Sequence, residues 1–398
     1  MSHLKTTHVF LFLFLFAGLV AIRTGWAQTY TVLYSFTGGA DGALPEGKLI
    51  MDTAGNLYGT SEGNRTGTTQ GSVFKLSPSG MFTLLHNFGT GGAGGARPYA
   101  GLARDSAGNL YGTTFSGGAS NAGAVFKLDN KDNFSVLYSF TGKADGGGPL
   151  APLILDPAGN LYGTTFDGGS PSCGDCGVVF KLDTKGNETV LHTFARPRYG
   201  EFPYAGLLRD AAGNLYGTTT GGGRGGAGIV FKLDAADTET VLYTFPNKAA
   251  GRDPWSTLIE DAAGNFYGTT TTGGKGNCGG EACGVVFKLD TNGNETVLYT
   301  FTGKTDGGTP AAGLVMDSAG NLYGTAFIGG AGYGVVFKVD PLGKETVLYA
   351  FGGGADGGHP YGGLTIDSAG NLYGTAGGGG LFDCQNGSGC GVVFKITP

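Results

Sequence analysis

A six-residue segment, Gly-Asn-Leu-Tyr-Gly-Thr, occurs seven times in this chain of 398 residues, with Phe in place of Leu in one copy. The copies occupy residues 55–60, 108–113, 159–164, 213–218, 264–269, 320–325 and 370–375. A period of about 50 residues is typical of a repeat protein, because a unit of this size buries its apolar face only against neighbouring units. The sequence therefore predicts seven copies of one structural unit.

Each repeat contains four short segments rich in Val, Leu, Phe, Tyr and Thr, bounded by Gly, Asp and Asn. In the third repeat they are residues 151–156, 160–165, 177–183 and 187–194. Such segments are typical of β-strands, and no segment of useful length has the amphipathic pattern of a helix. Tight turns join the first segment to the second and the third to the fourth, which predicts antiparallel four-stranded sheets.

The turns themselves explain most of the repeated Asp and Asn residues. Between the third and fourth segments the turn residue is Gly in several repeats, but it is Asp132 in one and Asp237 in another. Asp is among the few residues besides Gly that tolerate a positive φ, so the exchange indicates a left-handed backbone at this position. We therefore interpret the repeated Asp and Asn residues as turn residues and not as ligands.

The order of the segments predicts a closed ring. The repeat region opens with residues 30–36, which correspond to a fourth strand, and closes with residues 391–397, which correspond to a third strand. These two segments complete one four-stranded unit if they pair, whereas an open array would need polar caps at both ends. We predict an all-β, seven-bladed β-propeller of four-stranded antiparallel blades, in which the N-terminal strand completes the last blade.

The composition agrees with an ordered protein. Glycine accounts for 81 residues, a content that low-complexity chains also reach. However, 12% of the residues are aromatic and 14% are charged, so enough apolar surface is present to offset the entropy lost on folding. We expect a glycine-rich but folded chain.

Residues 1–27 have the features of a secretory signal peptide: a lysine near the start, an apolar run over residues 9–22 and small residues before a cleavage site. An uncleaved anchor is the alternative, but the run is shorter than the about 20 residues of a membrane helix. We expect a secreted extracellular, cell-surface or periplasmic protein whose mature part, residues 28–398, lacks a stable membrane span. That part has 23 Lys and Arg against 31 Asp and Glu, so nucleic acid is not an expected partner.

The repeat resembles a known bacterial family. The pattern of residues 205–219 (AGLLRDAAGNLYGTT), followed by Gly-Val-Val-Phe-Lys-Leu-Asp and Glu-Thr-Val-Leu-Tyr, resembles the GloVer (Gloeobacter/Verrucomicrobia-type) tandem repeat. It is also similar to NHL-type propeller blades. The resemblance covers about residues 29–398 and implies an exported bacterial protein, but no particular activity.

The six cysteines form three close pairs in the loops between the second and third strands. The pairs are Cys173 with Cys176, Cys278 with Cys283, and Cys384 with Cys390. In an exported chain, an even number of closely paired cysteines favours disulfides that join the two ends of a loop. Cys-x-x-Cys is also half of a zinc site, but the three pairs belong to different blades and cannot share an ion. We predict three disulfides and no metal.

The sequence offers little material for catalysis or for a cofactor. It contains no His-Glu-x-x-His, no Gly-x-Ser-x-Gly and no phosphate-binding loop followed by a helix. Asp41, Asp145, Asp306 and Asp356 each precede a Gly in a loop between blades and could contribute to calcium sites. One carboxylate per loop is few for an ion that takes six or more oxygen ligands, and turn chemistry explains these residues equally well. We expect no cofactor, with calcium as the alternative.

One face of the ring carries the differences among repeats. The loops between blades and those between the second and third strands emerge on this face. The residue after the proline that precedes each first strand would surround the mouth of the central channel. These residues are Glu46, Tyr99, Leu150, Tyr204, Trp255, Ala311 and Tyr361.

The aromatic members of this set are the candidate binding residues. We predict that Tyr99, Tyr204, Trp255 and Tyr361 stack on a ligand, while the three polar residues Glu46, Asp167 and His359 hydrogen-bond to it. The expected partner is a polysaccharide or a cell-surface protein. Three alternatives stay open: aromatics that only pack on neighbouring blades, a polysaccharide lyase or hydrolase acting at this face, and a purely structural surface protein.

Overall fold

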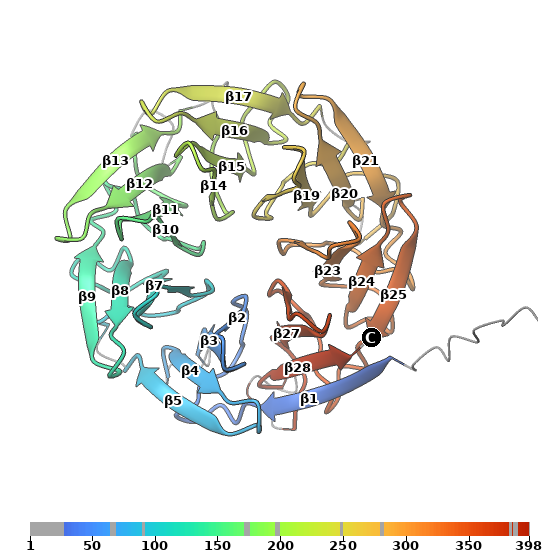
Figure 1. Cartoon of the computed structure of the whole chain (residues 1–398), viewed down its shortest axis with the longest axis horizontal. Coiled ribbons are helices and arrows are strands. Elements are labelled where there is room, and N and C mark those ends of the chain that lie inside the picture. Colours follow the sequence, from blue (N-terminus) through green and yellow to red (C-terminus); the bar gives the residue numbers. More distant parts are fainter. Residues whose placement is uncertain are drawn as a thin grey trace, which may run out of the picture.

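The computed structural model describes residues 28–63, 69–89, 92–170, 176–195, 200–246, 250–278, 282–381, 384 and 389–397. The predicted signal peptide, residues 1–27, lies outside these ranges. The described residues form seven four-stranded sheets and no α-helix, so none of them belongs to a helix that could span a membrane. The sheets are the blades of one ring (Figure 1). The predicted seven-bladed propeller is confirmed.

The first three blades follow one another along the chain. Blade one contains β2 (Ile50–Met51), β3 (Leu57–Ser61), β4 (Ser72–Leu76) and β5 (Phe82–Asn87). Blade two contains β6 (Ala103–Arg104), β7 (Leu110–Thr114), β8 (Ala124–Leu128) and β9 (Phe134–Ser139). Blade three contains β10 (Ile154–Leu155), β11 (Leu161–Thr165), β12 (Val178–Leu182) and β13 (Glu188–Thr193).

The next three blades repeat this order. Blade four contains β14 (Leu208–Arg209), β15 (Leu215–Thr219), β16 (Ile229–Leu233) and β17 (Glu239–Thr244). Blade five contains β18 (Ile259–Glu260), β19 (Phe266–Thr270), β20 (Val285–Leu289) and β21 (Glu295–Thr300). Blade six contains β22 (Val315–Met316), β23 (Leu322–Ala326), β24 (Val335–Val339) and β25 (Glu345–Ala350).

Blade seven joins the two ends of the propeller. It contains β26 (Thr365–Ile366), β27 (Leu372–Ala376), β28 (Val392–Thr397) and β1 (Thr29–Ser35). β1 pairs antiparallel with β28 from Thr29 opposite Thr397 to Ser35 opposite Val392, and the two strands lie side by side in Figure 1. The predicted closure is therefore confirmed, although the innermost strand of each blade is shorter than expected. In blade three it is Ile154–Leu155 instead of residues 151–156, and the innermost strand of every other blade also has two residues.

Each repeated motif builds one hairpin and one close packing contact. In blade one the Asp52 carboxylate accepts hydrogen bonds from the Ala54 and Asn56 backbone N–H groups, the Asn56 amide and the Tyr58 hydroxyl, at 2.9–3.0 Å. The following Gly59 has no side chain because a Cβ there would lie 2.6 Å from the Phe74 ring. Asp132 and Asp237 adopt φ values of 64° and 60°. The repeated Asp and Asn residues are turn residues, as predicted.

The core lies between the blades. A fully buried Phe at the end of each outermost strand meets the Phe of the third strand of the next blade edge to face, at 5.0–5.4 Å between ring centroids. The pairs are Phe36–Phe74, Phe88–Phe126, Phe140–Phe180, Phe194–Phe231, Phe245–Phe287, Phe301–Phe337 and Phe351–Phe394. An edge-to-face aromatic pair contributes about 0.5–1.5 kcal/mol beyond the burial of its area. Every junction between blades, including the one closed by β1, is stabilised in this way.

The outer edge of these junctions is of two kinds. Three junctions hold parallel ring stacks, namely Tyr34–Phe82, His86–Phe134 and Tyr30–Tyr349. The other four place a Glu from one blade beside a Tyr or His of the preceding blade, namely Glu188 by Tyr138, Glu239 by His192, Glu295 by Tyr243 and Glu345 by Tyr299. Each of these four Glu residues has a buried carboxylate oxygen without a hydrogen-bond partner among the described residues.

Candidate functional site

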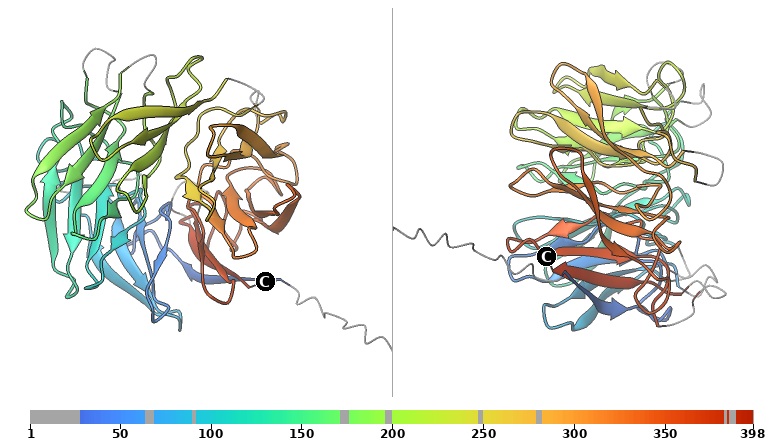
Figure 2. Two further views of the ribbon diagram at one scale, coloured as in Figure 1. Left: turned by 45° about the horizontal axis from the view of Figure 1, so that its top comes forward. Right: turned by 90° about the vertical axis from the view of Figure 1, so that its right-hand side faces the viewer.

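A cavity lies at the mouth of the central channel. All seven residues that follow the prolines before the first strands line it, and we call them the mouth ring: Glu46, Tyr99, Leu150, Tyr204, Trp255, Ala311 and Tyr361. The volume of the cavity is about 580 Å³. The blades form a disc, seen from the side in the right-hand view of Figure 2. Ile154 of β10 and Ile259 of β18, in innermost strands, also line the cavity.

The loops beside the cavity lie on one face, because they pair with one another. Isolated β-bridges join a loop between blades to the residues that follow the second strand, as in Gly147 with Asp167 and Gly308 with Ile328. The backbone N–H of Gly147 donates to the carbonyl oxygen of Asp167 at 2.9 Å, and the reverse bond is also 2.9 Å. The loops between blades and the loops after the second strands therefore emerge on the same face of the ring, as predicted.

A second ring lies two residues further along each blade. This neck ring consists of Lys48, Gly101, Pro152, Gly206, Thr257, Gly313 and Gly363, all of which line the cavity. The neck is tight, since a Cβ on Gly206 would lie 2.8 Å from Oγ1 of Thr257 and 3.0 Å from Pro152. The close approach of neighbouring blades therefore leaves no room for a side chain at Gly206.

The aromatic residues of the mouth ring pack on their neighbours and also face the cavity. The rings of Tyr204 and Trp255 are parallel within 7°, with centroids 4.6 Å apart. Tyr204 also contacts Phe166 at 4.7 Å, and Tyr361 contacts Phe327 at 4.7 Å. These five residues, Phe166, Tyr204, Trp255, Phe327 and Tyr361, are only partly buried. Tyr204, Trp255 and Tyr361 therefore pack on neighbouring aromatic rings and also line the cavity.

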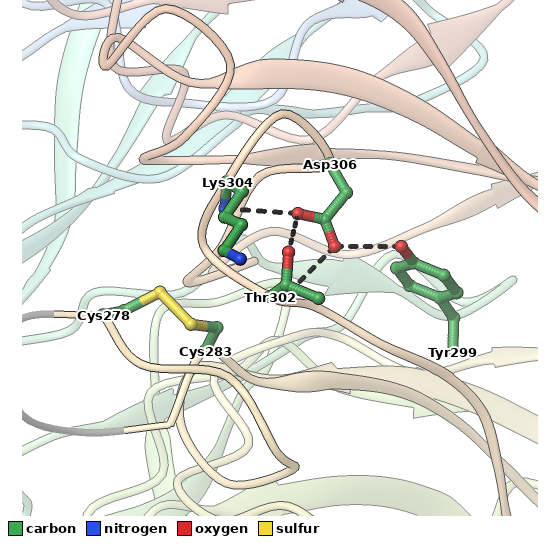
Figure 3. The surroundings of a disulfide bond; sticks show 6 residues. All are labelled: Cys278, Cys283, Tyr299, Thr302, Lys304 and Asp306. Atoms are coloured by element: carbon green, nitrogen blue, oxygen red, sulfur yellow. Dashed lines mark hydrogen bonds between the residues drawn. A yellow bond between two sulfur atoms is a disulfide. The ribbon is translucent and has the colours of Figure 1, made fainter.

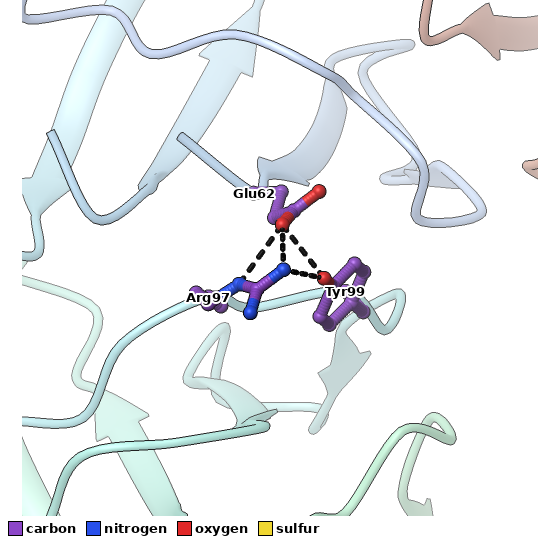
Figure 4. A network of polar contacts seen from close by, with 3 residues as sticks. All are labelled: Glu62, Arg97 and Tyr99. Atoms are coloured by element: carbon purple, nitrogen blue, oxygen red, sulfur yellow. Dashed lines mark hydrogen bonds and ion pairs between the residues drawn. The ribbon is translucent and has the colours of Figure 1, made fainter. Parts of the chain in front are cut away.

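A polar network holds one edge of the mouth (Figure 4). Oε1 of Glu62 accepts hydrogen bonds from Nε of Arg97 at 2.9 Å and from the Tyr99 hydroxyl at 2.6 Å, and Arg97 also donates to that hydroxyl. The Glu62 side chain is 2% exposed and that of Arg97 is 42% exposed. Burial, followed by the hydrogen bond to Glu62, raises the pKa of Tyr99, so this hydroxyl stays protonated. The network fixes the Tyr99 ring at the cavity wall.

Two predicted polar residues do not line the cavity. Asp167 lies near Tyr204, and together with burial, the larger effect, it raises the pKa of that tyrosine. His359 lies against the Phe327 ring at 4.8 Å, and its Nδ1 is 3.3 Å from the Phe327 carbonyl oxygen. Glu46, in contrast, does line the cavity.

The sequence analysis missed Lys48, Glu62 and Arg97. Aligning the repeats could have revealed two of them, because Lys48 stands where other blades have Gly, Pro or Thr, and Glu62 stands where blade two has Phe115. The available signal was a charged residue at a position where the other repeats have uncharged residues.

Two of the predicted disulfides lie in the described part of the chain. Cys278 pairs with Cys283 and Cys384 with Cys390, with Cα atoms 5.2 and 4.9 Å apart. Cys176 is also disulfide-bonded, while its predicted partner Cys173 lies outside the described residues. The described residues contain no group of three or more His, Cys, Asp or Glu side chains that could hold a metal ion.

The Asp residues that precede a Gly in the loops between blades serve as turn residues. Figure 3 shows Asp306 beside the Cys278–Cys283 disulfide, with its carboxylate accepting bonds from the Tyr299 hydroxyl at 2.9 Å and the Thr302 N–H at 2.8 Å. The same arrangement recurs at the remaining three, Asp41, Asp145 and Asp356. These carboxylates bind donors of their own loops, which supports the turn interpretation over a calcium site.

The fold is also found in two solved structures at low sequence identity. Two structures of the extracellular domain of BT4673 from B. thetaiotaomicron, described as a one component system in one and a hybrid two component system in the other, give TM-scores of 0.58 at 10% and 12% identity. The similarity covers 92% of this chain and 40% and 39% of those chains, so this chain spans about two fifths of their length. The gluconolactonase XC5397 from Xanthomonas campestris gives a TM-score of 0.43 at 16% identity, over 75% of this chain and 86% of the other.

The sequence comparisons concern the repeats directly. No curated protein sequence matches the chain. The model of the Gloeobacter/Verrucomicrobia repeat matches three overlapping regions, residues 18–176, 67–282 and 250–398. These regions contain all seven copies of the motif and all seven blades. The chain therefore belongs to the Gloeobacter/Verrucomicrobia repeat family.

Proposed function

We propose that this protein is an exported, non-catalytic binding propeller that holds a glycan in the mouth cavity. The observation that carries the proposal is the set of four aromatic residues, Tyr99, Tyr204, Trp255 and Tyr361, around one concave cavity of about 580 Å³. Ligand sites are typically concave, largely apolar and about 300–1,000 Å³ in volume, with a few polar groups that fix orientation. The cavity has this size and this composition.

The chemistry of the cavity wall favours a sugar over a protein partner. Flat aromatic rings present apolar area at little entropic cost and can stack on the C–H faces of sugar rings. Glu46 and Arg97 add hydrogen-bonding groups at the wall. A stable protein complex buries about 800 Å² on each partner, which calls for a broad surface and not a narrow channel mouth. A short stretch of polysaccharide fits this shape better.

The cysteines support the exported location. Disulfides persist in oxidising compartments and are rare in the cytosol. The Cys278–Cys283 and Cys384–Cys390 disulfides are consistent with an extracellular or periplasmic location.

Calorimetric titration of the chain from residue 28 onward against a panel of oligosaccharides tests the proposal. Trp255→Ala should weaken binding of the panel member that binds best by about 2 kcal/mol or more, roughly thirtyfold, because it removes a central aromatic anchor. The matched control is Lys185→Ala, an exposed residue in the turn between β12 and β13, which should bind like the unchanged protein. Melting curves of both variants show whether the ring is intact.

Three results would count against the proposal. Equal weakening by both substitutions, or an effect of Trp255→Ala that only follows its lower melting temperature, would remove the aromatic wall from the binding site. Release of shorter sugars during incubation would contradict the absence of catalysis. Binding of a surface protein but of no glycan would show that the ligand is a protein and not a sugar.

A further inference from the structure

Lys48 is the only long side chain of the neck ring. The other six positions hold Gly, Pro or Thr, and all seven residues line the same cavity. The stem of Lys48 lies against blade seven, since a Cβ on Gly363 would be 3.5 Å from its Cδ and 3.7 Å from its Cγ. The side chain is exposed to the channel, so its ammonium group can meet a ligand that enters from the mouth.

The charge of Lys48 has no counter-ion in the described part of the chain. The ion pairs between described residues join Arg97 to Glu62, His192 to Glu239 and Arg252 to Asp253. Glu46 also lines the cavity, but its Cγ and Oε1 lie on the side of Gly377, 3.6 Å from where a Cβ of that glycine would be. The blades that surround the channel partly desolvate the ammonium, and this lowers the pKa of Lys48.

The second cation of the cavity is already neutralised. Arg97 binds the buried Glu62 carboxylate through Nε, and its other nitrogen contacts the same oxygen. Lys48 is therefore the cation of the cavity lining without an ion-pair partner among the described residues, in a wall that is mainly apolar and aromatic. An isolated ammonium is a point charge that suits a single negative charge, whereas an arginine fork binds carboxylate or phosphate through two hydrogen bonds.

We propose that the glycan held in the mouth cavity is an acidic one, and that the carboxylate of a uronic acid unit pairs with the ammonium group of Lys48 while neighbouring sugar rings stack on Tyr204 and Trp255. This inference rests on the function proposed above and names its ligand class. The carboxylate supplies a counter-ion to the ammonium. Lys48 thereby selects acidic over neutral sugars, and the aromatic wall provides affinity for both.

Titration with oligogalacturonate and with its methyl ester tests this selectivity on the unchanged protein. The two sugars have the same rings, and the ester lacks only the charges. A hydrogen bond between charged partners corresponds to about a 10- to 100-fold difference in affinity, which is the preference expected for the acid. A sulfated oligosaccharide of equal length distinguishes carboxylate from other single negative charges.

Substitutions of Lys48 assign the preference to this residue. Lys48→Met keeps the apolar stem and should lower affinity for the acid about 10- to 100-fold while leaving the ester unaffected. Lys48→Arg should retain the preference, and the control Lys185→Met should change neither affinity. Trp255→Ala should weaken acid and ester alike.

The outcomes separate this inference from the proposed function. Equal affinity of the unchanged protein for acid and ester, stronger binding of the sulfated sugar, or a preference that survives in a folded Lys48→Met variant would overturn the acidic-glycan assignment and leave glycan binding intact. Absence of binding to every oligosaccharide would overturn both. A loss of acid binding in Lys48→Met with retained ester binding supports the inference, because an unfolded variant would bind neither.

Discussion

The ring of Tyr30, in the first strand of the propeller, stacks on the ring of Tyr349 in blade six, with centroids 3.7 Å apart and 8° between the planes. The Tyr30 hydroxyl also donates a hydrogen bond to the backbone carbonyl of Asp356. Tyr30, which lies at the N-terminal end of the propeller sequence, therefore joins blade seven to blade six. The closing strand contributes side-chain contacts to the neighbouring blade as well as backbone pairing with β28.

Removal of this strand should open the ring. Deleting residues 30–36 exposes the edge of β28 and removes the fully buried Phe36, whose loss alone should cost about 3–5 kcal/mol. We expect a markedly lower melting temperature or aggregation, measured by calorimetry and light scattering. A chain that begins at Thr29 is the control. A deletion variant that remains monomeric and melts like this control would show that the strand does not close the ring.

Four outer junctions should make stability fall as the pH rises. Burial, followed by the charge of Asp145, raises the pKa of Glu188 to about 7. Burial, followed by the charge of Asp306, raises the pKa of Glu345 to about 7. Burial alone raises the pKa of Glu239 to about 7. Burial also raises the pKa of Glu295. The folded state therefore keeps protons that the unfolded chain releases near pH 4.5. The stabilisation from these protonated side chains is complete below about pH 4.5 and is lost by about pH 7.

Chemical unfolding at several pH values measures this effect. A pKa unit corresponds to about 1.4 kcal/mol, and because the side chains are only partly buried we expect about 1 kcal/mol for each residue. Glu239→Gln should flatten the decline between pH 5 and 7 by that amount, whereas Glu260→Gln, at an exposed acid in β18, should not. Parallel pH profiles for the two variants would contradict the assignment.

The hairpin carboxylates should act in the opposite direction. Although burial raises the pKa of Asp261, hydrogen bonds from Asn265, Tyr267 and Ala263 outweigh it and lower the pKa to about 2, so this stabilisation is present above about pH 3.8 and lost as the pH falls toward 2. Asp261→Ala should lower the free energy of unfolding by about 1–3 kcal/mol, because several buried or turn donors lose their acceptor. The measurement is the urea midpoint at pH 6, with Glu260→Ala as the neighbouring control. An unchanged midpoint for Asp261→Ala would show that the turn does not depend on this carboxylate.

The disulfides should stabilise the ring modestly. The Cys278–Cys283 loop spans five residues, for which the chain-entropy model gives about 2 kcal/mol. Replacing both cysteines with Ser should lower the free energy of unfolding by about that amount, and the same replacement at Cys384 and Cys390 serves as the comparison. Peptide mapping of the exported protein should recover six oxidised cysteines paired within each loop, including Cys173 with Cys176. Free thiols in all three pairs, or bridges between blades, would reject the prediction.

Most of the fold was predictable because the signals are local. The Asp-x-x-Gly-Asn turns, the positive φ of Asp132 and the alternation of short apolar segments each depend on residues within one hairpin. The count of strands then required residues 30–36 to complete the last blade, since no other partner for β28 was left in the sequence. The positions of the mouth ring followed from the same periodicity, because equivalent residues of a symmetric ring must face the same axis.

What the sequence could not decide are contacts between residues in different blades. Lys48 meets Gly363 only because the ring closes, and Glu62 meets Arg97 and Glu239 meets His192 only because consecutive blades pack against each other. The exclusion of Asp167 and His359 from the cavity lining has the same origin, since their loops fold back on β-bridges and aromatic neighbours whose positions depend on the adjoining blade. The sequence by itself determined the unit, the number of units and the closure, because these depend on local turn chemistry and strand count. The tertiary structure decided which side chains share the cavity and which charges lack partners, because those depend on how closely neighbouring blades approach around the axis.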